Sequence, residues 1–73
     1  MTSAQLHAFV TVAQVNNFTT AALMLGISQS AVSHAIKSIE KDLGVDLFFR
    51  VKAEIVLTEL GSNILIKAHS ILE

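Results

Sequence analysis

The stretch from Ser28 to Leu43 constrains the fold of this chain more than any other segment. Its large apolar residues recur at steps of four, three and four. At about 3.6 residues per turn, this spacing aligns them on one side of an α-helix. Ser28 is a favourable residue for starting a helix, and Gly44 is a favourable residue just past its end. The sequence therefore predicts a helix over 28–43 whose buried side consists of Val32, Ile36, Ile39 and Leu43.

The opposite side of this helix carries short or planar hydrogen-bonding side chains rather than the Glu/Lys mixture of an ordinary solvated face. Near a helix N-terminus, such groups can reach the donors and acceptors on base edges in the major groove of DNA. The alternative is an amphipathic helix whose polar side faces only water. The candidates for base contact are Gln29, Ser30, Ser33 and His34. Further along the helix, Lys37 and Lys41 are candidates for contact with the phosphate backbone.

Length and composition exclude several classes of protein. With 73 residues, the chain is one small domain that buries only about 60% of the surface of its unfolded state. It has no cysteine, so disulfides and thiolate metal sites are excluded, and its apolar runs are far too short to span a bilayer. No basic segment opens the chain, as a signal peptide would require. We therefore expect a cytoplasmic protein with no metal or other cofactor and no membrane partner.

The net charge of −1 counts against a nucleic-acid partner. The distribution of charge is more favourable, because most basic residues lie in one segment. Residues 1–36 contain no Asp, Glu, Lys or Arg, and four of the five basic residues lie at positions 37–52. Because one copy would neutralise few phosphates, binding to DNA would be weak per domain and would depend on dimerisation. We expect Glu40 to form a structural ion pair with Lys37 or another of these basic residues.

A first helix is predicted near the N-terminus. Thr2 or Ser3 can cap its start, and Asn16-Asn17 favours a turn at its end. Between these positions, large apolar residues recur with helical spacing. The expected buried side of this helix is Leu6, Phe9, Val10 and Ala13.

A short second helix is predicted just before Ser28. Phe18 precedes Thr19 in the manner of an apolar residue ahead of an N-cap, so we expect this helix to cover 20–25 and to end at Gly26. Two helices joined by a short turn with a Gly, the second with a polar outer face, form the helix-turn-helix arrangement that sets a recognition helix in the major groove. Because the first helix of such a pair lies across the DNA backbone, Thr19 and Thr20 become candidates for phosphate contact.

After the long helix the spacing of apolar residues changes. Two β-prone runs, 48–51 and 55–58, flank Lys52-Ala53-Glu54 and predict a short hairpin, or wing. Thr58 can cap a last helix over 59–73, which has no stop signal. Its apolar side is longer than one compact core can cover, so we expect a partner helix from a second copy or a missing C-terminal part, and a chain cut within a longer helix. The candidates for dimerisation are Ile64, Leu65, Ala68, Ile71 and Leu72.

A series of short motifs runs through the chain in a characteristic order. They are Phe18-Thr19-Thr20-Ala21-Ala22, Ser28-Gln29-Ser30-Ala31-Val32-Ser33, Ile39-Glu40, Leu43-Gly44-Val45, Leu47-Phe48, Arg50 and Leu57-Thr58-Glu59-Leu60-Gly61. In order and spacing, the sequence resembles the N-terminal domain of the LysR-type transcriptional regulators over essentially its whole length.

This resemblance implies a mainly α fold. We expect a winged helix-turn-helix domain over 1–58, with a three-helix core, a β-hairpin wing and the helix-turn-helix at about 18–37. A linker helix over 59–73 would pair with its counterpart in a dimer. In the family, a C-terminal domain that is absent here binds effectors and senses a small-molecule co-inducer.

The resemblance also assigns roles to individual residues. It makes Ser28 the cap, puts Thr20 near phosphate, and matches Arg50 to the family's basic residue at the wing. Position 34 is often Arg or Lys in the family, whereas the imidazole found here can donate or accept a hydrogen bond. The wing departs from the pattern at Ala53, where the family usually has a basic residue, and Lys52 is the nearest substitute. The set assigned to the groove is Gln29, Ser30, Ser33 and His34.

The leading hypothesis is sequence-specific binding of double-stranded DNA by a bacterial regulator of transcription. It would act as a dimer or higher oligomer, with one recognition helix in each half-site of an operator. The alternative is a winged-helix module for protein interaction or dimerisation without a DNA target. No catalytic constellation supports an enzyme, since Gly26-Ile27-Ser28-Gln29-Ser30 lacks the final Gly of the esterase nucleophile elbow.

Overall fold

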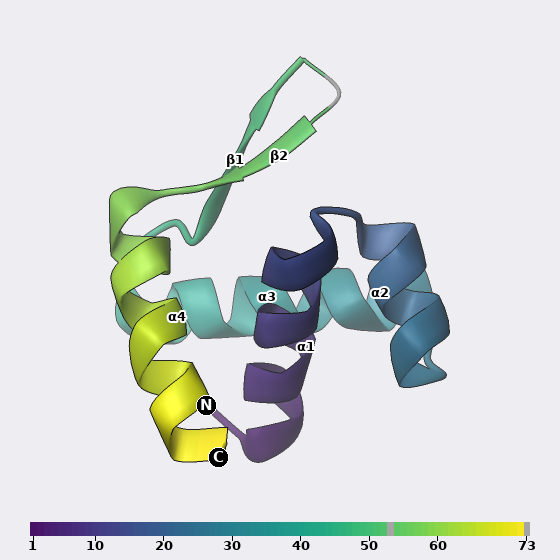
Figure 1. Cartoon of the computed structure of the whole chain (residues 1–73), viewed down its shortest axis with the longest axis horizontal. Coiled ribbons are helices and arrows are strands. Elements are labelled where there is room, and N and C mark those ends of the chain that lie inside the picture. The colour runs from purple at the N-terminus through teal and green to yellow at the C-terminus, as the bar shows by residue number, and fades with distance from the viewer. Residues whose placement is uncertain (53, 73) are drawn as a thin grey trace.

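The computed structural model describes residues 1–52 and 54–72, the last of them by its backbone only, and contains four helices and a two-stranded hairpin (Figure 1). The hairpin extends away from the helices, and the start of α1 and the end of α4 lie on the side of the molecule opposite the hairpin (Figure 1). This is the three-helix core, wing and following helix that the sequence predicts. The elements are α1 (Ser3–Val15), α2 (Phe18–Leu25), α3 (Gln29–Leu43), β1 (Phe48–Val51), β2 (Glu54–Leu57) and α4 (Glu59–Leu72).

Local hydrogen bonds fix most helix boundaries at the predicted residues. Thr2 and Gln5 form a reciprocal capping box at α1, in which each side chain accepts the backbone N–H of the other residue at 3.0–3.1 Å. The hydroxyl oxygen of Ser28 accepts a backbone N–H and begins α3. Gly26 and Gly44 end α2 and α3 with φ of 69° and 68°. Glycine adopts this left-handed conformation without the clash that a Cβ would cause.

The start of α2 differs from the prediction. Asn17, not Thr19, is the N-cap, and its Oδ1 accepts a hydrogen bond of 2.9 Å from the N–H of Thr20. Phe18 is therefore the first helical residue, and both threonines lie in the first turn. Asn caps a helix at least as well as Thr. The Asn pair that the sequence assigned only to a turn thus supplies the cap.

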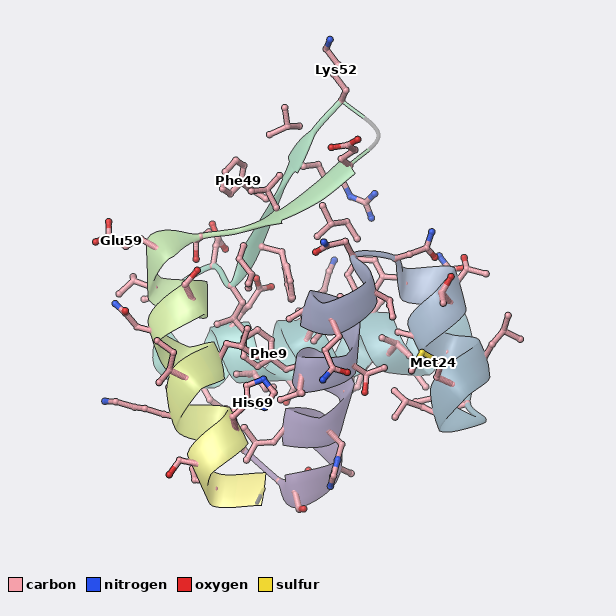
Figure 2. All side chains as sticks on the ribbon, in the orientation of Figure 1. Phe9, Met24, Phe49, Lys52, Glu59 and His69 are labelled. Atoms are coloured by element: carbon pink, nitrogen blue, oxygen red, sulfur yellow. The ribbon has the colours of Figure 1, made fainter. Side chains whose placement is uncertain are left out.

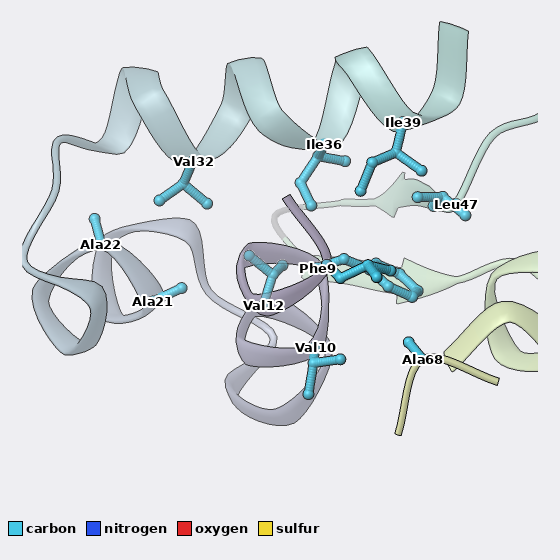
Figure 3. Packing of buried hydrophobic residues seen from close by; sticks show 11 residues of the cluster. Phe9, Val10, Val12, Ala21, Ala22, Val32, Ile36, Ile39, Leu47 and Ala68 are labelled. Atoms are coloured by element: carbon cyan, nitrogen blue, oxygen red, sulfur yellow. The ribbon is translucent and has the colours of Figure 1, made fainter. Parts of the chain in front are cut away.

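The core forms where α1, α2 and α3 pack together (Figure 3). Phe9 is fully buried, and its ring meets that of Phe48 edge-on with 5.6 Å between centroids. The predicted burial is wrong for two residues. Leu43 is 40% exposed, because the chain turns away at Gly44. Ala13 is only half-buried. The buried cluster is Leu6, Phe9, Val10, Val12, Ala21, Ala22, Val32, Ile36, Ile39, Leu47 and Ala68.

The wing is an antiparallel pair with Phe48 opposite Leu57 and Val51 opposite Glu54. The second strand is shifted one residue towards the N-terminus relative to the prediction, which releases Thr58 from the sheet to cap the last helix. At the tip, Lys52 has a φ of 60°, the left-handed conformation that tight hairpin turns use. The prediction that concerns Ala53 falls outside the described residues.

The last helix, α4, packs against α1 and contributes to the core of the same protomer. Ala68 is 1% exposed, and Ile64 and Leu65 pack half-buried against the cluster. Ala68 therefore offers no surface to a second copy, contrary to the prediction, because α1 covers the middle of α4. Ile71 is 68% exposed and stays available to a partner. The side chain of Leu72 lies outside the described residues.

Candidate nucleic-acid interface

The outer side of α3 is open to solvent. Gln29, Ser30 and His34 are exposed, Ser33 is half-buried, and together with Lys37 they line one shallow depression. The structure thus brings all four residues predicted for base contact onto one continuous surface, with the first lysine at its edge. We call these five residues the polar face of α3.

Lys41 lies apart from this polar face. It is exposed at the other end of α3, in a depression that it shares with Glu40 and Asp46. The structure therefore does not group Lys41 with the other predicted DNA contacts, and carboxylates stand beside it.

Glu40 does not form the ion pair expected from the sequence. Its Oε2 accepts a hydrogen bond of 2.8 Å from the N–H of Leu47, because the chain returns alongside α3 after Gly44. Among the described residues, the ion pair that does form joins the amino group of Met1 to Asp42 at 3.3 Å.

The N-terminal ends of α2 and α3 meet through their side chains. The hydroxyl of Thr19 donates a hydrogen bond of 3.1 Å to Oε1 of Gln29. The backbone N–H of Thr20 is already bound to Asn17, so only its exposed hydroxyl is left to meet a phosphate. At the start of α3, the oxygen of Ser28 serves its own helix cap, and its hydroxyl hydrogen can still be donated.

Arg50 of the wing lies against the start of α2. Its guanidinium carbon is 5.8 Å from the centre of the Phe18 ring, the geometry of a cation–π contact. The Phe18 ring in turn meets Phe48 edge-on at 6.4 Å. The sequence identified Arg50 as a basic residue of the wing but did not identify Phe18 as the ring that holds it.

A second depression joins the wing to the polar face. It is lined by Asn16, Asn17, Phe18, Thr19, Gln29, Arg50 and Ile55. The two asparagines were missed as surface residues of the site, although an Asn just ahead of a Phe-Thr-Thr helix start is itself an N-cap signal. Gln29 lines both depressions. The polar face of α3 is therefore continuous with a second surface, which crosses the start of α2 and reaches the wing.

Lys52 stands at the far end of the wing, exposed and pointing away from the helices (Figure 2). Lys37 of α3 and Arg50 of the wing line a further pocket together with Ser33 and Glu40, and Lys52 lies beyond it on the wing. The residues that line the two depressions include no carboxylate. The hydrogen-bonding residues of α3 therefore adjoin cations from α3 and from the wing.

Other kinds of site find little support in the part of the chain that the structure describes. Within residues 1–52 and 54–72, no group of three His, Asp or Glu residues comes together to hold a metal ion. None of the four described helices combines the length and apolar content of a membrane-spanning segment.

A three-helix core with a polar, exposed third helix and a hairpin wing defines a winged helix-turn-helix protein. Comparison with known families refines this class. The family model described as "Bacterial regulatory helix-turn-helix protein, lysR family" matches residues 3–62. The chain therefore belongs to the LysR family, which confirms the resemblance seen in its motifs.

Two curated relatives illustrate the match. The uncharacterised HTH-type transcriptional regulator YfeR of Shigella flexneri is 44% identical over 69 residues, which cover 94% of this chain and 22% of that protein. The HTH-type transcriptional regulator CfxR of Cupriavidus necator is 44% identical over 72 residues, which cover 99% and 23%. The chain thus spans less than a quarter of the length of these regulators.

Solved structures of similar domains include complexes with DNA. The CbnR DNA-binding domain in complex with DNA has a TM-score of 0.93 and 38% identity, and the match covers 99% of this chain and 83% of that one. The BenM DNA-binding domain bound to catB site 1 DNA has a TM-score of 0.93 and 32% identity, with 99% and 81% covered. Full-length OxyR from Pseudomonas aeruginosa has a TM-score of 0.93 and 38% identity, with 99% and 24% covered.

Proposed function

We propose that this chain binds double-stranded DNA sequence-specifically, with α3 in the major groove, as the DNA-binding part of a transcriptional regulator. The observation that carries this proposal is the division of α3 into two sides. Val32, Ile36 and Ile39 are buried in the core, while the polar face of α3 is turned to solvent. An α-helix fits the major groove, which is about 12 Å wide, and uncharged polar side chains can read base edges there. The DNA complexes of two similar domains support this assignment.

We assign different tasks to the centre and the edges of the surface. The centre, formed by Gln29, Ser30, Ser33 and His34, contacts base edges, because these side chains lie at the start of the exposed helix and can donate or accept hydrogen bonds there. Lys37, Arg50 and Lys52 contact phosphates, as do the hydroxyls of Thr20 and Ser28. With so few cations, one protomer neutralises few phosphates and binds weakly by itself.

Two copies compensate for this weakness. We propose a homodimer through α4, which exposes Leu60 and Ile71. Each protomer measures 27 × 24 × 20 Å, so two fit side by side on half-sites about 34 to 36 Å apart, one turn of the DNA. The dimer doubles the number of phosphate contacts, and therefore steepens the dependence of binding on salt.

Selection from a random pool of duplexes, followed by fluorescence anisotropy, tests the proposal. We expect one sequence to be enriched and to bind more tightly than a scrambled duplex of the same composition. Binding to both should weaken as salt rises, with a slope of about 0.9 per phosphate contact on a double-logarithmic plot. No signal with either duplex at low ionic strength would contradict DNA binding and favour a protein-interaction module.

A further inference from the structure

Thr19 touches the residue that opens α3. Its Oγ1 donates to Oε1 of Gln29 at 3.1 Å, and both side chains are exposed. The two residues belong to different helices, and each lies in the first turn of its own. Asn17 caps one helix and Ser28 caps the other, so both backbones are held in place while the side chains meet.

The contact limits how Gln29 presents its amide. A glutamine side chain has several rotatable bonds, and an exposed one samples many rotamers. Its amide has an oxygen that accepts and an NH₂ group that donates two hydrogen bonds. The hydrogen bond from Thr19 occupies one lone pair of the oxygen and leaves the NH₂ group free. In this arrangement Thr19 holds the oxygen of the Gln29 amide, and both N–H donors of the amide are available to a ligand.

We propose that Thr19 is a positioning residue for base recognition, which orients the amide of Gln29 so that it discriminates at one base position. This inference rests on the proposed function, in which α3 enters the major groove. There the free NH₂ group finds acceptors at purine N7, guanine O6 or thymine O4. The role differs from the phosphate contact that the sequence suggested for Thr19, because the hydroxyl hydrogen is used within the protein.

Substitutions at position 19 test this role. Binding is measured to the duplex that the wild-type chain selects from a random pool, and to duplexes that differ from it by one base pair. Thr19→Val removes the hydroxyl with little change of shape, and Thr19→Ser keeps it. We expect Gln29→Ala to lose discrimination between base pairs at one position of the duplex. At the same position, Thr19→Val should lower the ratio of affinities for the right and the wrong base pair about fivefold, the factor of one neutral hydrogen bond. Thr19→Ser should retain it. In the Gln29→Ala background, Thr19→Val should add nothing.

Thr11→Val is the matched control, because it makes the same chemical change on α1, away from the interface. Thermal melting by circular dichroism verifies that each variant is folded. If Thr19→Val weakens binding to every duplex by one common factor, and does so in the Gln29→Ala background as well, then Thr19 contacts phosphate and the inference is overturned. If Gln29→Ala relaxes discrimination and Thr19→Val does not, the inference fails while the proposed function stands. If the wild-type chain selects no sequence, both fail.

Discussion

A Cβ added to Gly61 would collide with the carbonyl oxygen of Leu47. Gly61 lies in the first turn of α4, and Leu47 directly precedes β1, so α4 packs on bare backbone at the base of the wing. Thr58 binds the same segment: its N–H donates to the carbonyl of Leu47 at 3.0 Å, and its hydroxyl donates to the carbonyl of Asp46. These contacts fix the start of α4 relative to the wing and the end of α3.

Replacement of Gly61 by Ala should therefore destabilise the fold. Ala is better than Gly inside a helix by up to about 1 kcal/mol, but here the added methyl group meets backbone that no side-chain rotation can move. We expect a net loss of about 1–3 kcal/mol, measured by urea unfolding. Ser62→Ala, at the next and exposed position, serves as the control and should leave the midpoint unchanged or raise it slightly. An unchanged midpoint for Gly61→Ala would show that α4 can shift away from Leu47.

Removal of the Glu40 carboxylate should also destabilise the chain. Glu40→Ala leaves the N–H of Leu47 without its acceptor, which should cost about 1–3 kcal/mol in the free energy of unfolding. Glu40→Gln keeps an oxygen at the same place and should lose less. Equal losses in the two variants would mean that the charge of Glu40, rather than this hydrogen bond, stabilises the turn.

Two positions of α3 that the sequence treats alike should respond differently to truncation. Ile39→Ala empties a fully buried site and should cost about 2–5 kcal/mol, measured by chemical denaturation. Leu43→Ala should cost less than half as much, because Leu43 is already substantially exposed. Comparable losses would place Leu43 in the core after all.

Loss of the wing residue Arg50 should weaken binding to every duplex. Arg50→Gln removes a proposed phosphate contact, so the slope of log K against log salt should fall by about 0.9 for each protomer, measured by anisotropy with the selected and the scrambled duplex. Lys67→Gln removes a positive charge from α4 and should leave the slope unchanged. A loss confined to the selected duplex would assign Arg50 to base recognition instead.

The proposed dimer makes a prediction for α4. Ile71→Gln should raise the concentration at which two copies associate, as sedimentation velocity would reveal, because it replaces an exposed apolar residue of the proposed contact. Ile66→Gln is the matched control, since Ile66 is equally exposed but lies on another side of the helix. Similar effects of both changes would argue against a contact specific to the side of Ile71.

The candidate site could be predicted from the sequence only in part. Gln29, Ser30, Ser33 and His34 were placed together correctly, because helical periodicity relates residues within one helix. The same periodicity made Lys41 a candidate for phosphate contact on this helix, and the structure shows it beside Asp46, which comes from the loop after α3. Periodicity contains no information about a neighbouring element, so the sequence could not show that Asp46 lies beside Lys41.

The sequence by itself determined the helices, most of their caps and the class of the protein. The caps at Thr2, Ser28 and Gly44 depend on hydrogen bonds that span at most four residues, and these follow from local residue types. Only the tertiary structure decided that Arg50 stacks on Phe18, that Ala68 is buried and that Gly61 meets Leu47. Each of these contacts joins different elements, so it depends on how the helices and the wing pack, which no local pattern specifies.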